Sequence, residues 1–129
     1  MAAVTPSVKT TPAVNGWKYV IYSGTGAADT IAALTTTAVA KHKVQKLIYA
    51  SCTYSDTPTQ AGVTTTVDDS LGASFDSLMN TGSANATYTL YAPTVEIPLA
   101  PGDAIVVTAP AAGGVITAAL KVVVAEKDD

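Results

Sequence analysis

Residues 94–126 read TVEIPLAPGDAIVVTAPAAGGVITAALKVVVAE, and this stretch decides the fold of the chain. Pro101 and Gly102 predict a tight turn, because proline presets φ at the first corner and glycine tolerates positive φ at the second. A second turn is predicted at 110–114, which holds a proline and two glycines. The runs rich in valine and isoleucine at 105–109 and 115–125 predict strands. Short turns between such strands are typical of an antiparallel sheet.

The upstream sequence supplies partners for these strands. Pro98 confines its own strand to an edge or a bulge, because proline cannot donate to a ladder. The segment 42–55 is apolar on both faces through its middle, which indicates a central strand. Further strands are predicted at 17–23, 63–67, 75–79 and 86–92. Together these elements predict an all-β fold, a single antiparallel β-sandwich that is jelly-roll-like, with about eight strands.

This predicted sandwich occupies residues 16–126, with an extended N-terminal arm at 1–15 and a solvated tail at 127–129. The arm is predicted to be extended because its two prolines bias the residues before them away from helix. Val4, Val8 and Val14 are its isolated apolar points. Two interpretations stay open: an arm laid across a neighbouring subunit, with these valines as its contacts, or a disordered tail.

The composition limits the classes of partner. Charged residues make up 13% of the 129 residues, about half the usual share. So little charge leaves few solvated faces to oppose association, and predicts a homo-oligomer covered by neighbours. All the basic residues are lysines, which argues against nucleic-acid binding because arginine is the usual residue for phosphate and base contacts. No apolar run reaches the ~18 residues of a membrane span, and no signal-peptide core is visible, so assembly in the cytoplasm is expected.

Two stretches resemble chemical motifs only in part. The sequence GTGAAD at 24–29 follows a predicted strand, as in a dinucleotide-binding loop, but Asp29 stands where that loop needs a small residue. A hairpin turn is therefore expected there, and no cofactor. Asp68 and Asp69 are the best carboxylate candidates, but neighbours on a strand point to opposite faces. We therefore expect solvated turn acids rather than a metal site, with a calcium site as the open alternative.

Catalytic constellations are missing from the sequence. The chain has one histidine and one cysteine, which excludes ordinary zinc sites. Neither a nucleophile elbow nor a phosphate-binding loop occurs, so no enzymatic activity is predicted. Cys52 is expected to pack in the core as a small hydrophobe. Tyr88 and Tyr91 are candidates for a sugar-binding face, although cross-strand packing explains them as well.

Two segments suggest a family. KVQKLIYASCTYSDTPTQAGVTTTVDD at 43–69 and LAPGDAIVVTAPAAGGVITAALKVVV at 99–124 resemble small β-sandwich proteins of tailed-bacteriophage virions in their order of strands and Pro/Gly turns. The resemblance covers residues 43–125 and brings no catalytic motif. It implies a structural protein of the virion, foremost a capsid decoration or cement protein whose partners are the major capsid protein or other virion proteins. The alternative is a head- or tail-associated module that binds a receptor or a carbohydrate.

Overall fold

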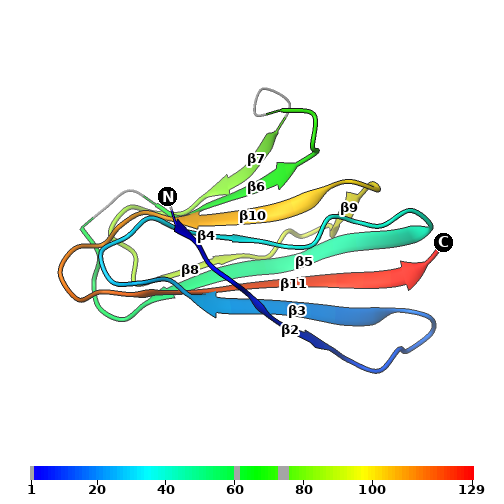
Figure 1. Cartoon of the computed structure of the whole chain (residues 1–129), viewed down its shortest axis with the longest axis horizontal. Coiled ribbons are helices and arrows are strands. Elements are labelled where there is room, and N and C mark those ends of the chain that lie inside the picture. The colour runs from blue at the N-terminus through cyan, green and yellow to red at the C-terminus, as the bar shows by residue number, and fades with distance from the viewer. Residues whose placement is uncertain (1, 60–61, 73–75) are drawn as a thin grey trace.

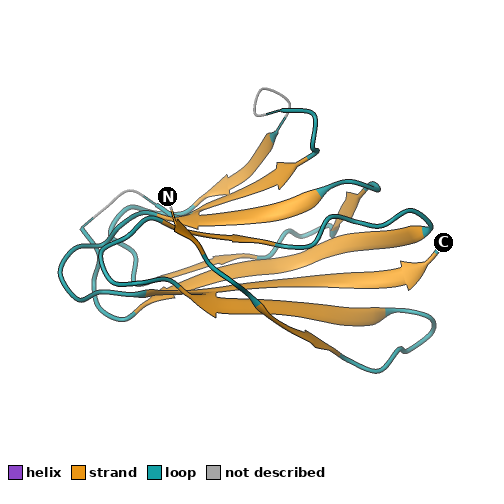
Figure 2. Cartoon of the chain, viewed as in Figure 1, coloured by secondary structure: helices purple, strands orange, loops and turns teal. Residues whose placement is uncertain are grey.

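The computed structural model describes residues 2–59, 62–72 and 76–129 and is built of strands, with no helix in these residues (Figure 2). Two sheets face each other (Figure 1). The strands are β1 (Ala2–Ala3), β2 (Ser7–Thr10), β3 (Lys18–Thr25), β4 (Ala32–Thr35), β5 (Lys43–Tyr54), β6 (Thr64–Asp68), β7 (Ser77–Thr81), β8 (Tyr88–Tyr91), β9 (Ile97–Leu99), β10 (Ala104–Ala109) and β11 (Ala118–Asp128).

The strand order confirms the predicted jelly-roll sandwich. One sheet has the order β1-β4-β10-β6-β7, and the other has β2-β3-β11-β5-β8, with β9 also paired to β5. From β3 onward the chain passes from sheet to sheet, except at the β6–β7 hairpin and the step from β8 to β9. Without the arm strands β1 and β2, and with β8 and β9 counted as one interrupted strand, eight strands form two facing four-stranded sheets, as in a jelly roll. Every pair is antiparallel except β1 with β4.

The core lies between β5 and β11 of one sheet and β4 and β10 of the other. β5 and β11 pair from Tyr54 opposite Ala118 to Lys43 opposite Asp128. Their inward side chains meet those of the facing sheet in one cluster, whose largest fully buried side chains are Leu34, Leu47, Cys52, Ile105, Val107, Leu120, Val122 and Val124. The strand predicted at 42–55 is therefore central, as its apolar faces indicated. Cys52 is a core residue, as predicted.

Burial sets the chemistry of the single thiol. The Cys52 side chain has no exposed surface, and burial raises the pKa of its thiol to about 12. We expect native protein to resist a thiol-specific reagent at about pH 8, near the ordinary pKa of cysteine, and to be labelled once per chain in urea. Full labelling of the native protein at that pH would contradict this burial.

Two boundaries in the C-terminal stretch differ from the prediction. The last strand begins at Ala118 rather than at 115, because Gly113 and Gly114 adopt positive φ and the next residues bond to neighbouring loops. The same strand continues to Asp128, so the predicted tail at 127–129 is largely strand. Lys43 on β5 forms an ion pair with Asp128 there.

The N-terminal arm is extended, as predicted, and joins both sheets of its own domain. β1 pairs with β4 in one sheet and β2 pairs with β3 in the other, so the arm crosses the open side of the sandwich (Figure 1). Val4 packs against the core, and its N–H donates to the Ala33 carbonyl at 2.8 Å. Val8 and Val14 are 56% and 70% exposed. Val4 is therefore engaged within its own chain, and of the three valines only Val8 and Val14 are free to meet a neighbour.

The glycines of the 24–29 loop allow neighbouring side chains to pack closely against the backbone. A Cβ at Gly24 would lie 2.5 Å from a Val4 methyl, and one at Gly26 would lie 2.5 Å from the Ala32 Cβ. The loop is not the expected hairpin, because β3 and the following β4 belong to different sheets. The turn predicted at 56–62 includes residues 60–61, and the strand predicted at 75–79 includes Phe75, which lie outside the described residues.

Candidate functional site

The outer face of the six-stranded sheet carries the most distinctive side chains. On β3, Tyr22 points into the core, whereas Tyr19 and Ile21 point outward. The register places Tyr19 beside Ala125 of β11 and Ala125 beside Lys46 of β5. Because strands alternate their faces, this row and its neighbours present one continuous surface.

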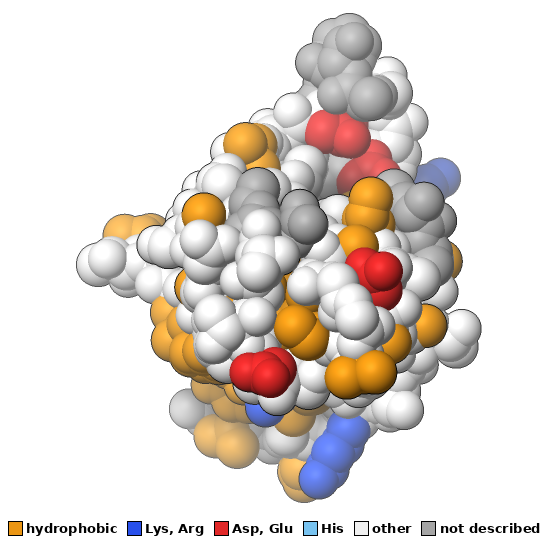
Figure 3. Space-filling view, turned by 90° about the vertical axis from the view of Figure 1, so that its left-hand side faces the viewer, with side chains coloured by type: hydrophobic (Ala, Val, Ile, Leu, Met, Phe, Trp, Pro, Cys, Tyr) orange, Lys and Arg blue, Asp and Glu red, His pale blue; other side chains and the backbone are white. Residues whose placement is uncertain are grey.

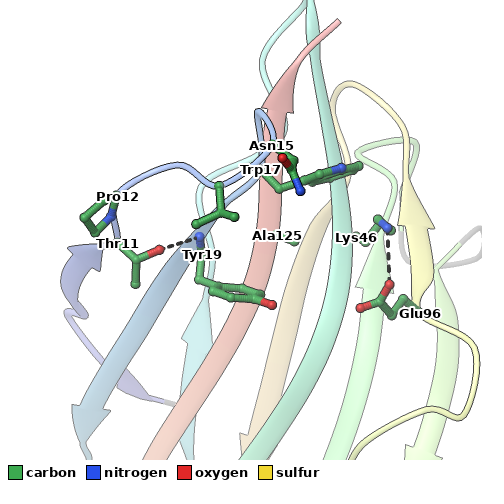
Figure 4. Close-up of a pocket in the computed structure, with 9 residues that line it drawn as sticks. Thr11, Pro12, Asn15, Trp17, Tyr19, Lys46, Glu96 and Ala125 are labelled. Carbon is green, nitrogen blue, oxygen red and sulfur yellow. Dashed lines mark hydrogen bonds and ion pairs between the residues drawn. The ribbon is translucent and has the colours of Figure 1, made fainter.

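An aromatic hollow lies at the end of this face where β2 turns into β3 (Figure 4). It has a volume of about 510 Å³. The Trp17 and Tyr19 rings lie on either side of the small Ala125 side chain (Figure 4). The residues that line the hollow are Thr11, Pro12, Val14, Asn15, Trp17, Tyr19, Lys46, Glu96 and Ala125.

A tight turn positions one wall of the aromatic hollow. Val14 and Trp17 exchange two backbone hydrogen bonds, of 2.7 and 3.0 Å. Asn15 and Gly16 between them have φ of 53° and 81°. Positive φ at both central residues defines the hairpin turn for which Asn-Gly is the preferred pair. The Asn-Gly dipeptide was a sequence signal for this turn, and the predicted arm boundary at residue 15 cut through it.

Charges hold the Trp17 ring in place. The Lys46 ammonium lies 4.2 Å from the ring centroid, and the Lys127 ammonium lies 4.8 Å from it. Such cation–π contacts contribute about 0.5–1 kcal/mol each at exposed sites. Lys46 also forms an ion pair with Glu96 at 3.2 Å (Figure 4). The aromatic hollow therefore contains adjacent charges of opposite sign.

A second depression follows on the same face. It has a volume of about 550 Å³ and is lined mostly by hydroxyl-bearing and small residues, which are Thr5, Ser7, Ser23, Gly24, Thr25, Ser51, Thr53, Ala119, Leu120 and Lys121. The Lys121 ammonium lies 5.5 Å from the Tyr49 ring centroid. This hydroxyl-lined groove extends the polar part of the surface toward the other end of the sheet.

Tyr88 and Tyr91 do not form a shared face. Tyr88 is 55% exposed, whereas Tyr91 is half-buried and packs against the core. Their separation of three positions places them on opposite faces, because side chains on a strand alternate. The two rings therefore do not form one candidate sugar-binding face, and the packing of Tyr91 agrees with the alternative interpretation of these residues. Trp17 and Tyr19, two positions apart, are the aromatic pair that shares the outer face, and neither was predicted as a site residue.

An acidic cluster lies near the β6–β7 connection. Asp68, Asp69 and Asp76 bring carboxylate oxygens within 4.8 Å of one another. The expectation that Asp68 and Asp69 cannot converge is wrong, because β6 ends at Asp68 and the alternation of faces ends with it. Burial, followed by the neighbouring Asp68 and Asp69 carboxylates, raises the pKa of Asp76. A cation bound at this cluster would reduce the repulsion between its three carboxylates.

The raised pKa of Asp76 has a consequence for stability. An acid whose pKa is higher in the folded state stabilises the fold below its unfolded pKa, and this contribution is lost as the pH rises through the folded pKa. Asp76→Asn should therefore raise the urea midpoint at about pH 7, with a smaller gain at about pH 3, where the carboxylates are largely protonated. Asp29→Asn is the matched control, since Asp29 is exposed and asparagine tolerates its φ of 51°. An unchanged or lower midpoint for Asp76→Asn at pH ~7 would contradict the repulsion.

Comparison with known proteins finds only distant structural similarities. No protein-family model and no curated protein sequence matches the chain. Among solved structures, the Schizosaccharomyces pombe Cnp3 cupin domain is 10% identical with a TM-score of 0.37, and the alignment covers 98% of this chain and 69% of that one. A family 29 carbohydrate-binding module is 11% identical with a TM-score of 0.35, covering 92% and 73%. The low-affinity xylan-binding module CBM86 from Roseburia intestinalis is 11% identical with a TM-score of 0.31, covering 97% and 86%.

The chain is therefore a β-sandwich domain of jelly-roll topology, which its own strand order establishes. At these TM-scores the similarities to the cupin domain and the carbohydrate-binding modules carry no functional argument. No helix in the described chain could span a membrane.

Proposed function

We propose that the chain is a non-enzymatic structural protein of a bacteriophage virion, a capsid decoration protein that acts through protein–protein contacts. The observation that supports this proposal is the surface at one end of the sandwich, where four connections meet. These connections, which we call the loop end, are 26–31, the described residues of 55–63, 82–87 and 110–117 (Figure 1). Their surface carries few charges and exposes some apolar side chains, and hydrogen bonds link the loops to one another.

Hydrogen bonds between the loops hold the loop end together. The Asp29 N–H donates to the Ile116 carbonyl at 3.2 Å, and the Thr117 N–H donates to Ser55 Oγ at 2.9 Å. The hydroxyl of Tyr54, the last residue of β5, donates to the Pro110 carbonyl at 2.9 Å. Such cross-links pre-organise a surface, so less conformational entropy is lost when a partner binds.

The side chains of the loop end suit burial against another protein. Val115 is 88% exposed and Ile31 is 44% exposed. Asp29 and Asp56 are the charged residues among the described residues of these loops, and no lysine lies there. Figure 3 shows hydrophobic side chains spread over this end between a few charged groups. Exposed apolar surface with little charge marks interaction sites, because burying it costs little desolvation.

The proposal is tested on purified particles that carry this gene. We expect quantitative mass spectrometry to find the chain in many copies per particle. Val115→Asp should reduce its incorporation, because a carboxylate would be buried unpaired in the contact. Val95→Asp is the matched control, since Val95 is 80% exposed and lies between β8 and β9, away from the loop end. Particles that lack the wild-type chain would contradict the virion role, and equal incorporation of both variants would contradict the role of the loop end.

A second candidate function is that of a carbohydrate-binding module. The aromatic hollow favours it, because two aromatic rings and an exposed ion pair face the same open space. This function would use the outer face of the six-stranded sheet and would leave the loop end free.

A further inference from the structure

We propose that the aromatic hollow binds one ring of a neutral pyranose sugar. This inference gives a site and a ligand class to the second candidate function, on which it rests, and it does not depend on the virion role. Three features of the hollow support it: its aromatic walls, the donors and acceptors at its rim, and its balance of charge.

The Tyr19 wall fits the apolar face of a sugar ring, whereas the Trp17 ring carries the Lys46 and Lys127 ammonium groups. Tyr19 is 50% exposed on the outer face, so one side of its ring is open to a ligand. Ala125 between the two aromatic residues has a small side chain, which keeps the floor of the hollow clear (Figure 4). Pyranoses carry several C–H groups on one face, and burying these against an aromatic ring removes apolar surface from water without breaking hydrogen bonds.

The rim offers donors and acceptors at the spacing of neighbouring hydroxyls. The Lys46 ammonium and the Glu96 carboxylate are 3.2 Å apart, with 33% and 45% of their side chains exposed. One sugar hydroxyl can donate to the carboxylate while the adjacent hydroxyl accepts from the ammonium. The Asn15 amide lines the hollow beside Trp17 and can both donate and accept (Figure 4). Sites with an aromatic body and a few converging polar groups are typical of small-ligand binding.

The charge balance favours a neutral ligand. Glu96 and Lys46 are the charged residues among those that line the hollow, and they pair with each other, while the Lys127 ammonium is taken up by the Trp17 ring. A charged ligand would attract one member of the pair and repel the other, whereas hydroxyl groups can bond to both. The contacts of Lys46 and Lys127 with Trp17 keep its ring oriented before any ligand arrives, which lowers the entropy lost on binding.

The test uses the single tryptophan of the chain as its reporter. Cellohexaose, maltohexaose, mannohexaose and chitohexaose would each be titrated into the full chain while the fluorescence of Trp17 is followed, with hyaluronan fragments as the anionic comparison. We expect at least one neutral oligosaccharide to give a saturable change and to protect Trp17 from quenching by acrylamide. Tyr19→Ala should weaken this binding about tenfold, because the sugar loses its apolar contact with one aromatic ring.

Tyr88→Ala is the matched control, because Tyr88 is 55% exposed on the same sheet face but does not line the hollow. It should leave the affinity unchanged. No saturable change with any neutral sugar would overturn the proposal. So would binding of the anionic sugar alone, or equal losses in both tyrosine variants. The Tyr19→Ala variant should still be incorporated into particles at the wild-type level, because the virion role is proposed for the loop end. Measuring its incorporation in parallel therefore tests the virion role separately from sugar binding.

Discussion

Truncation of Leu120 to alanine should lower the free energy of unfolding by about 2–5 kcal/mol. The side chain is 1% exposed on β11, the strand that pairs with both β3 and β5. Its loss removes apolar contacts and leaves a cavity, because the flanking strands are fixed by their ladders and cannot collapse into the space. Urea denaturation followed by the fluorescence of Trp17 measures the change.

Leu90→Ala is the matched control for this truncation. Leu90 lies on β8 with its side chain 50% exposed, so its removal creates no enclosed cavity. Its effect should stay within about 0.5 kcal/mol, as is usual for surface substitutions. Equal losses for the two variants would contradict the assignment of Leu120 to the core.

Substitution of Gly62 by alanine should destabilise the protein by about 3 kcal/mol, the upper end of the cost of overpacking. A Cβ at Gly62 would lie 1.7 Å from the carbonyl oxygen of Gly82, which is backbone and cannot rotate away. Gly82 is itself confined, since a Cβ there would lie 2.6 Å from a Thr89 methyl. The Gly82 N–H donates to the Val63 carbonyl at 2.8 Å, so moving the two segments apart would also strain this bond.

Gly102→Ala separates steric overlap from backbone strain. Gly102 has a φ of 91°, and a Cβ there would meet no atom within 4 Å. Its substitution should cost about 1 kcal/mol, which reflects only the disfavoured conformation of alanine at positive φ. If Gly62→Ala were as mild as Gly102→Ala in urea denaturation, the close approach of the two backbones would be refuted.

The sequence predicted the strands of the jelly roll best where turn residues delimit them. Pro98 was expected on an edge strand or a bulge, and β9 indeed pairs with β5 at the edge of its sheet. Gly102 was expected at a turn with positive φ and has one. In contrast, β4 was not predicted, because its sequence Ala32–Thr35 mixes alanine with one leucine and shows no clear alternation. Its burial comes from the facing sheet, which local residue preferences do not record.

The candidate sites were the least predictable part. Asp68, Asp69 and Asp76 converge because β6 ends at Asp68, so the alternation of faces that was assumed for Asp68 and Asp69 does not apply to them. The aromatic hollow joins Trp17 to Lys46 and Glu96, which come from three separate segments of the chain. No local pattern connects them, since their proximity depends on the register of β3, β11 and β5.

The sequence by itself determined that this is an all-β chain, where most of its turns fall and that the strand at 42–55 is internal to its sheet. These properties follow from local physics: the φ preferences of proline and glycine, and the alternation of side chains along a strand. Only the tertiary structure decided that the arm completes both sheets, that Val4 fills the space left by Gly24, and that Trp17 and Tyr19 form a hollow. Such contacts depend on strand order and register, which are set by the packing of the whole core.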